Sequence, residues 1–169
     1  MKKEYRLYNL LFPLWMLIWF PSWLWLFLIP MNYLLDYGVF RRTMAHLKIK
    51  DYVKKARKHT WKICLIGFVS DLIGAVMLLE TYEYLSRKGT EAHNTLANNI
   101  AYNPFGDIYS FLIVMLAVAL AGTCIYFFNS ILLKRDQDLD EKQIHRIALN
   151  LALITAPYLF LFPSYLLYS

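Results

Sequence analysis

One carboxylate in the sequence occupies a position where a carboxylate is costly. Asp71 lies near the middle of the apolar segment 61–84, whose other charged residues stand towards its ends. A charged side chain at the centre of a bilayer costs about 2.5–3.5 kcal/mol even on the lenient insertion scale. Asp71 therefore needs protonation, a polar partner or a water-filled cavity.

The residues that share a helix face with Asp71 are mostly small. Positions three or four apart lie on one face of a helix, and here they include Cys64, Gly67, Gly74 and Ala75. Small residues allow helices to approach each other closely in a membrane. We therefore expect Asp71 to point into a helix bundle and away from lipid.

Two later apolar segments supply candidate partners for Asp71. Thr123 and Thr155 lie at a similar predicted depth, whereas Asn129 and Asn150 lie nearer the cytoplasmic end. Two interpretations are about evenly balanced. Asp71 is either a protonated, hydrogen-bonded packing residue or a proton or cation site, since a carboxyl group that loses its hydration can titrate near neutral pH.

Asp36 is the second acidic candidate. It lies about one turn before Arg41 and Arg42, at the predicted cytoplasmic edge of the first apolar segment. Long basic side chains can reach a carboxylate in that position. The spacing favours a surface ion pair over a buried site.

The other reactive side chains form no pattern typical of an enzyme. The four histidines include no pair at i, i+4, and the two cysteines form no C-x-x-C motif. No G-x-S-x-G, H-E-x-x-H or Walker loop is present. The sequence therefore predicts no catalytic residue, metal or cofactor, although an enzyme embedded in the membrane stays open as the least supported class.

Four long apolar segments must position these residues: 7–40, 61–84, 108–133 and 144–168. The chain is 59% hydrophobic and 18% charged, against about 45–50% and 25% in soluble domains. A helix needs about 20 apolar residues to cross a bilayer, and no segment alternates as a barrel strand would. The sequence predicts an all-α, polytopic transmembrane helix bundle of about four spans, with residues 1–169 forming a single transmembrane domain.

The first segment is too long for one simple span and contains Pro13, Pro21 and Pro30. Proline inside a helix removes a hydrogen bond and clashes with the preceding turn. We expect a break near residue 21, which leaves a short N-terminal arm. A hairpin and a single crossing both remain open, so the side of the N-terminus is undetermined.

The distribution of positive charge predicts the topology. Nine of the 18 Lys and Arg residues lie in 41–62, and two lie in 86–107. Basic loops stay on the cytoplasmic side of a cell membrane. We therefore expect loops 41–62 and 134–146 to be cytoplasmic, and loop 86–107 and the C-terminus to be external. This account of the net charge of +6 makes nucleic-acid binding unnecessary.

Two loops have further predicted properties. In loop 41–62, Leu47, Ile49 and Ala56 contribute to a partly amphipathic helix that we expect to lie on anionic lipid. Loop 86–107 is rich in Asn and contains Gly and Pro, which is typical of an irregular loop.

Five runs resemble a pattern in small, uncharacterised polytopic membrane proteins of Gram-positive bacteria. In this sequence they are Phe20-Pro21-Ser22-Trp23-Leu24, Leu28-Ile29-Pro30-Met31-Asn32-Tyr33-Leu34-Leu35-Asp36, Gly67-Phe68-Val69-Ser70-Asp71-Leu72-Ile73-Gly74-Ala75, Asn103-Pro104-Phe105 and Thr155-Ala156-Pro157-Tyr158-Leu159. The resemblance covers all four segments. It implies a multi-span membrane protein and transfers no activity.

Two function classes follow from these features. The first is a small transporter or channel that works as a homo-oligomer and has Asp71 as its ionisable site. The alternative is an accessory or assembly subunit of a larger membrane complex, which docks through the small-residue faces and the basic loop.

Overall fold

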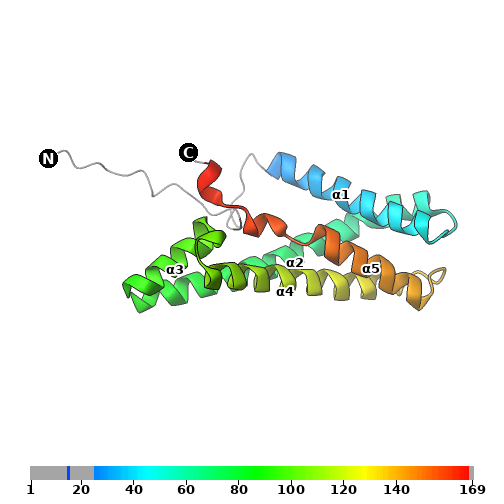
Figure 1. The fold of residues 1–169 in the computed structure, drawn as a ribbon. Helices are drawn as coiled ribbons and strands as arrows, with labels where there is room; N and C mark the ends of the chain where they lie inside the picture. The colour runs from blue at the N-terminus through cyan, green and yellow to red at the C-terminus, as the bar shows by residue number, and fades with distance from the viewer. Residues whose placement is uncertain (1–14, 16–24, 168–169) are drawn as a thin grey trace.

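The computed structural model describes Trp15 and residues 25–167, and within these residues the chain is helical with no strand (Figure 1). This confirms the all-α prediction for the described part of the chain. The α-helices are α1 (Trp25–His46), α2 (Tyr52–Lys88), α3 (Glu91–Tyr102), α4 (Ile108–Leu133) and α5 (Glu141–Thr155). The described residues also form three short 3₁₀ helices: η3 (Pro104–Gly106) between α3 and α4, and η4 (Tyr158–Leu161) and η5 (Ser164–Leu167) after α5.

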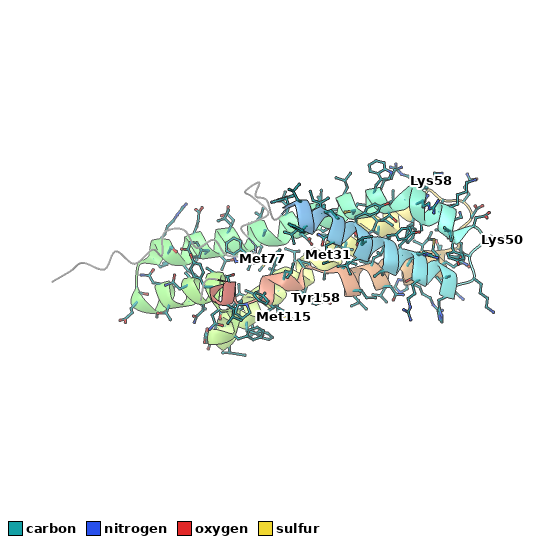
Figure 2. All side chains as sticks on the ribbon, turned by 90° about the horizontal axis from the view of Figure 1, so that it is seen from above. Met31, Lys50, Lys58, Met77, Met115 and Tyr158 are labelled. Carbon is teal, nitrogen blue, oxygen red and sulfur yellow. The ribbon has the colours of Figure 1, made fainter. Side chains whose placement is uncertain are left out.

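Helix α2 runs the length of the molecule, and the other helices pack along it in two groups (Figure 1). In one half, α1 contacts α2 and α5, and α4 also contacts α2 and α5, so four helices form a closed ring. In the other half, α3 packs against α2 and α4. We call the end where α1 turns into α2 and α4 into α5 the charged end. Figure 2 shows Lys50 and Lys58 there, and Met31 and Tyr158 nearer the middle.

Each half has its own hydrophobic core. The core near the charged end contains Met44, Ile63, Ile125, Leu133, Ile147 and Leu151 among its buried residues. The core of the other half contains Trp15, Leu78, Ile100, Val114, Ala117 and Phe160. Burying a side chain of the Leu or Ile type contributes about 1.5–3 kcal/mol, so each core helps to hold its own set of helices together.

Large apolar side chains also cover the outside of the bundle. Examples on α1, α4 and α5 that are at least half exposed are Leu26, Phe27, Met31, Leu34, Leu112, Leu116, Phe127, Ile131, Leu153 and Ile154. Monomeric soluble proteins rarely expose apolar patches larger than a few hundred Å². This outer surface is typical of helices that face lipid.

Three helical stretches are long and apolar enough to cross a membrane: Tyr52–Lys88, Ile108–Leu133 and Glu141–Leu161. These correspond to the last three of the four predicted segments. The described part of the first segment is helical as α1, which is not among these three stretches. The predicted break near residue 21 and the arm before it lie outside the described residues.

The fourth segment is helical in two parts, α5 and η4, with a break between them. Helix α5 ends at Thr155, and Ala156 has an extended ψ of 153° because the residue before a proline disfavours helical geometry. Pro157 also has no N–H to continue the helix. The 15 residues of α5 span about 22 Å, and η4 adds about 8 Å, so both parts are needed to span a bilayer.

The prediction of an irregular loop over 86–107 was wrong, because much of it forms α3. The Thr90 side chain caps this helix by accepting from the His93 backbone N–H. The buried face of α3 consists of Ala97, Ile100 and Ala101, at the three- and four-residue spacing of a helix. The Asn content of the segment concealed this pattern.

Two of the apolar residues of loop 41–62 that we expected to lie on lipid pack inside the bundle. Residues from Tyr52 onwards form the first turns of α2, and Ile49 and Ala56 are buried in the core near the charged end. The basic residues Arg57 and Lys58 are exposed. Contact of this loop with anionic lipid stays a prediction, which is based on those exposed charges.

Candidate functional site

A cavity of about 270 Å³ lies between α1, α2 and the segment that follows α5. Its lining is mostly apolar, with two carboxyl groups, Asp36 of α1 and Asp71 of α2. The third wall is the chain from Ile154 to Phe160, which includes the helix break. The cavity therefore combines the two acidic candidates with the interruption in the fourth segment.

One face of α1 forms the first wall. Trp25, Leu28, Asn32 and Asp36 all line the cavity, and their spacing of three or four places them on one side of a helix. The indole of Trp25 stacks on the ring of Phe68 from α2, with ring centroids 5.9 Å apart. Asp36 is only 5% exposed, so its carboxyl group is held inside the protein.

The small face predicted for α2 forms the second wall. Cys64, Gly67 and Asp71 line the cavity as neighbouring turns of one helix face. An added Cβ at Gly67 would lie 3.8 Å from Asp36 Oδ2, so the carboxyl of α1 packs directly beside the α2 backbone. A large side chain at Gly67 would displace that carboxyl.

Both carboxyl groups line the cavity, and Asp36 Oδ2 lies beside Gly67, one turn before Asp71 on α2. Asp71 Oδ1 is buried and has no hydrogen-bond partner within the described residues. Two carboxylates that share a site cannot both ionise without repulsion, and a buried charge needs a partner. The two carboxyl groups therefore lie together in the cavity without a positive side chain from the described residues that line it.

The third wall consists of interrupted helix. Thr155 lies beside Asp36, and its hydroxyl donates to the Leu151 carbonyl at 2.9 Å. The Tyr158 hydroxyl donates across the break to the Leu153 carbonyl at 2.5 Å. At membrane depth, irregular backbone is tolerated where it is buried in protein or lines a water-filled cavity.

Of the predicted site residues, Asp36, Asp71 and Thr155 come together in this cavity. The prediction that Asp36 forms a surface ion pair was wrong. Asp36 continues the buried stripe of Phe40 and Met44, whereas Arg41 and Arg42 are exposed. Among the described residues no ion pair includes Asp36.

The other three predicted polar residues lie elsewhere. Thr123 is exposed and donates to the Ala119 carbonyl of its own helix at 2.7 Å. Asn129 is buried and donates to the Ile125 carbonyl at 2.9 Å. Asn150 donates to the Thr43 hydroxyl at 3.2 Å, which ties α5 to α1. None of these three residues lines the cavity.

A second group of charges lies at the charged end. Lys55 Nζ is 2.8 Å from an oxygen of Asp136 and 2.8 Å from an oxygen of Asp138, and His59 Nε2 is 3.8 Å from Asp136. Burial raises the pKa of Asp136, but the hydrogen bonds and charge of Lys55 outweigh it and hold that pKa below its ordinary value. This group fastens the α4–α5 connection to the start of α2.

The aromatic lining of the cavity was not predicted from the sequence. Trp25 and Phe68 were not candidates, and neither was Tyr158. Trp25 carried a usable signal, because it lies eleven residues before Asp36 on the same helix face. The described residues contain no group of three or more His, Cys, Asp or Glu side chains that could hold a metal ion.

Comparison with protein-family models, with curated proteins and with solved structures gave no match to this chain. The cavity is therefore the feature of this chain that bears on its function. Its three elements are the carboxyl groups of buried Asp36 and half-buried Asp71, the aromatic walls and the broken helix beside Thr155.

Proposed function

We propose that this chain is a small multi-pass transport protein of the cell membrane, in which Asp36 and Asp71 bind a proton or a cation. Its three long apolar helices are compatible with an integral membrane protein. The observation that carries the proposal is that carboxyl groups from two different helices share one cavity beside an interrupted helix. Discontinuous helices form ion and substrate sites in many transporters.

The physical basis of the proposal is a charge deficit. Within the described residues, no Lys or Arg lines the cavity with the two carboxyl groups. Uncompensated carboxylates in a low-dielectric site attract a proton or a cation strongly. Binding and release at Asp36 and Asp71 would then be the chemical step of transport.

The break at Pro157 supplies an element that can move. Residues Tyr158–Leu161 form a 3₁₀ helix, whose hydrogen-bond geometry is poorer than that of an α-helix. A shift of this segment against α1 and α2 would change access to the carboxyl groups. We place the charged end in the cytoplasm, because it carries the basic loop 41–62.

We also propose a homo-oligomer, because so few helices rarely enclose a pathway alone. The outward apolar faces of α1 and α4, with residues such as Leu34 and Leu116, provide area for a second copy. The cavity itself is formed by one chain. Oligomer formation therefore contributes to the pathway and leaves the site intact.

The alternative of an accessory subunit has lost part of its basis. That alternative needs the small-residue faces for docking to a partner, but these faces pack against other helices of the same chain. An added Cβ at Gly74 would lie 3.0 Å from the Ala117 carbonyl oxygen, and one at Gly122 would lie 3.5 Å from that of Ala152. Of the two docking elements that the alternative named, the basic loop is the one left for a partner.

The test is flux of protons and of Na⁺ or K⁺ into vesicles that contain the purified full chain. We expect flux in the wild type and a decrease of about tenfold or more in both Asp36→Asn and Asp71→Asn, because each change removes an intramembrane charge. Glu80→Gln is the matched control, since Glu80 lies on the same helix as Asp71 but is exposed.

Two results would count against transport. One is a wild-type flux no larger than that of protein-free vesicles. The other is equal flux in the wild type and both Asp variants. Co-purification of a stoichiometric partner from native membranes, together with either result, would favour the accessory subunit.

A further inference from the structure

We infer that the cavity takes a compact organic cation with an apolar or aromatic group, such as a quaternary ammonium ion. This inference rests on the proposed transport function and specifies its substrate class. The observation behind it is the lining, which places two carboxyl groups among aromatic and aliphatic side chains.

The aromatic side chains come from all three walls. Trp25 and Phe68 stack on each other at the junction of α1 and α2, and Tyr158 and Phe160 lie on the opposite segment. Aromatic ring faces attract cations, and quaternary ammonium groups are recognised in this way. A site of this kind can bind a cation that donates no hydrogen bonds.

The same lining is poorly suited to a bare divalent metal ion. Ca²⁺ takes six to eight oxygen ligands, and Mg²⁺ needs a near-ideal octahedron. The side-chain oxygens of the cavity come mainly from Asp36 and Asp71, with Asn32 and Thr155 beside them, and apolar side chains make up most of the rest. An organic cation satisfies both the charge and the apolar surface.

The volume sets the size of the ligand. About 270 Å³ is just below the range of about 300–1,000 Å³ that is usual for small-molecule sites. A ligand with one ring and one ammonium group is therefore a better match than a large polycyclic dye.

The cavity opens towards the apolar outer surface. Ile154, Tyr158 and Leu159 line it, and each of them is about half exposed. These residues lie in the segment that we propose to be in the bilayer. An amphiphilic cation that partitions into the membrane can therefore reach Asp36 and Asp71 from the lipid side.

The test is calorimetric binding to the full chain in lipid nanodiscs, with protein-free nanodiscs subtracted. The probe is benzyltrimethylammonium, and the matched neutral probe is neopentylbenzene, which has carbon in place of the charged nitrogen. We expect the wild type to bind the cation and to bind the neutral probe much more weakly. K⁺ at the same concentration should not displace the cation.

Variants locate the site. We expect Asp71→Asn to weaken cation binding by about tenfold or more through loss of a charge partner, whereas Asp71→Glu retains most of it. Phe68→Leu should weaken binding by about two- to thirtyfold, the range of one cation–π contact. The controls Glu80→Gln and Phe128→Leu, both at exposed positions, should bind as the wild type does. An unchanged gel-filtration profile shows that each variant is folded.

The outcomes separate the inference from the proposed function. Binding without flux of any cation supports the inference and contradicts transport. Proton or Na⁺ flux without binding of the organic cation contradicts the inference and leaves transport standing. Equal binding of the neutral probe, or a co-purified lipid that the cation fails to displace, also overturns the inference.

Discussion

The cavity and the charged end surround their carboxyl groups in opposite ways. At the charged end, Asp136 and Asp138 are each 2.8 Å from Lys55, so the chain supplies its own counter-charge. In the cavity, Asp36 and Asp71 face apolar walls, and no Lys or Arg of the described chain lines it.

This difference distinguishes a charge that the fold neutralises from one that it leaves without a counter-charge. A carboxylate with a lysine beside it has its electrostatic requirement met by the fold, and its role is to hold segments together. A buried carboxyl group without such a partner costs free energy in the empty protein. Under the proposed function, a proton or a cation that binds in the cavity offsets that cost.

The largest expected effect comes from making the cavity resemble the charged end. Asn32→Lys places a cation one turn before Asp36 on the cavity face of α1. Because like charges placed together cost several kcal/mol, we expect binding of benzyltrimethylammonium to fall by about a hundredfold or more. The same calorimetric measurement checks this.

Asn32→Gln is the control for that variant, because it keeps an amide and adds no charge. It should bind the cation nearly as the wild type does. A lysine variant that binds equally well would show that the carboxyl pair is not the cation site.

The reverse change makes the charged end resemble the cavity. Lys55→Ala leaves Asp136 partly buried without its counter-charge. We expect a loss of about 1–3 kcal/mol in the free energy of unfolding, the usual range for a group left without its partner. Thermal unfolding of the protein in nanodiscs measures this loss.

Lys54→Ala is the matched control, since Lys54 is the preceding residue and is exposed. Its melting temperature should stay close to that of the wild type. If both alanine variants lose the same stability, helix α2 itself is responsible and the ion pair contributes nothing.

The smallest expected effect is a pH dependence of this ion pair. The pKa of Asp136 is lowered in the folded protein, so its stabilising contribution is present above the unfolded-state value of about 3.9. It decreases as the pH falls through the lower folded-state pKa. The difference in melting temperature between the wild type and Asp136→Asn should therefore be largest near pH 7 and shrink at acidic pH.

Glu141→Gln, at an exposed position in the same region, serves as the reference for general acid effects. Its difference from the wild type should change little over the same range. A difference for Asp136→Asn that persists unchanged below about pH 2.5, well under the ordinary carboxyl pKa, would contradict the electrostatic origin of the stabilisation.

Much of the helical architecture was predictable because it is encoded locally. Long apolar runs produced α4 at its predicted bounds, 108–133, and the membrane-depth part of α2. The cap of α3 at Thr90 and the break before Pro157 were also local signals, which the composition of their segments masked. These misses were errors of interpretation, since the residues responsible are close together in the chain.

By itself, the sequence determined the helices, the basic end and the cost of placing Asp71 inside an apolar segment. Tertiary structure alone decided which groups surround each carboxyl group. The pairing of Asp36 with Asp71 depends on how α1 lies against Gly67 of α2, and Lys55 reaches Asp136 across 81 positions. Helix formation follows from neighbouring residues, whereas the surroundings of a buried charge are set by which distant surfaces pack together.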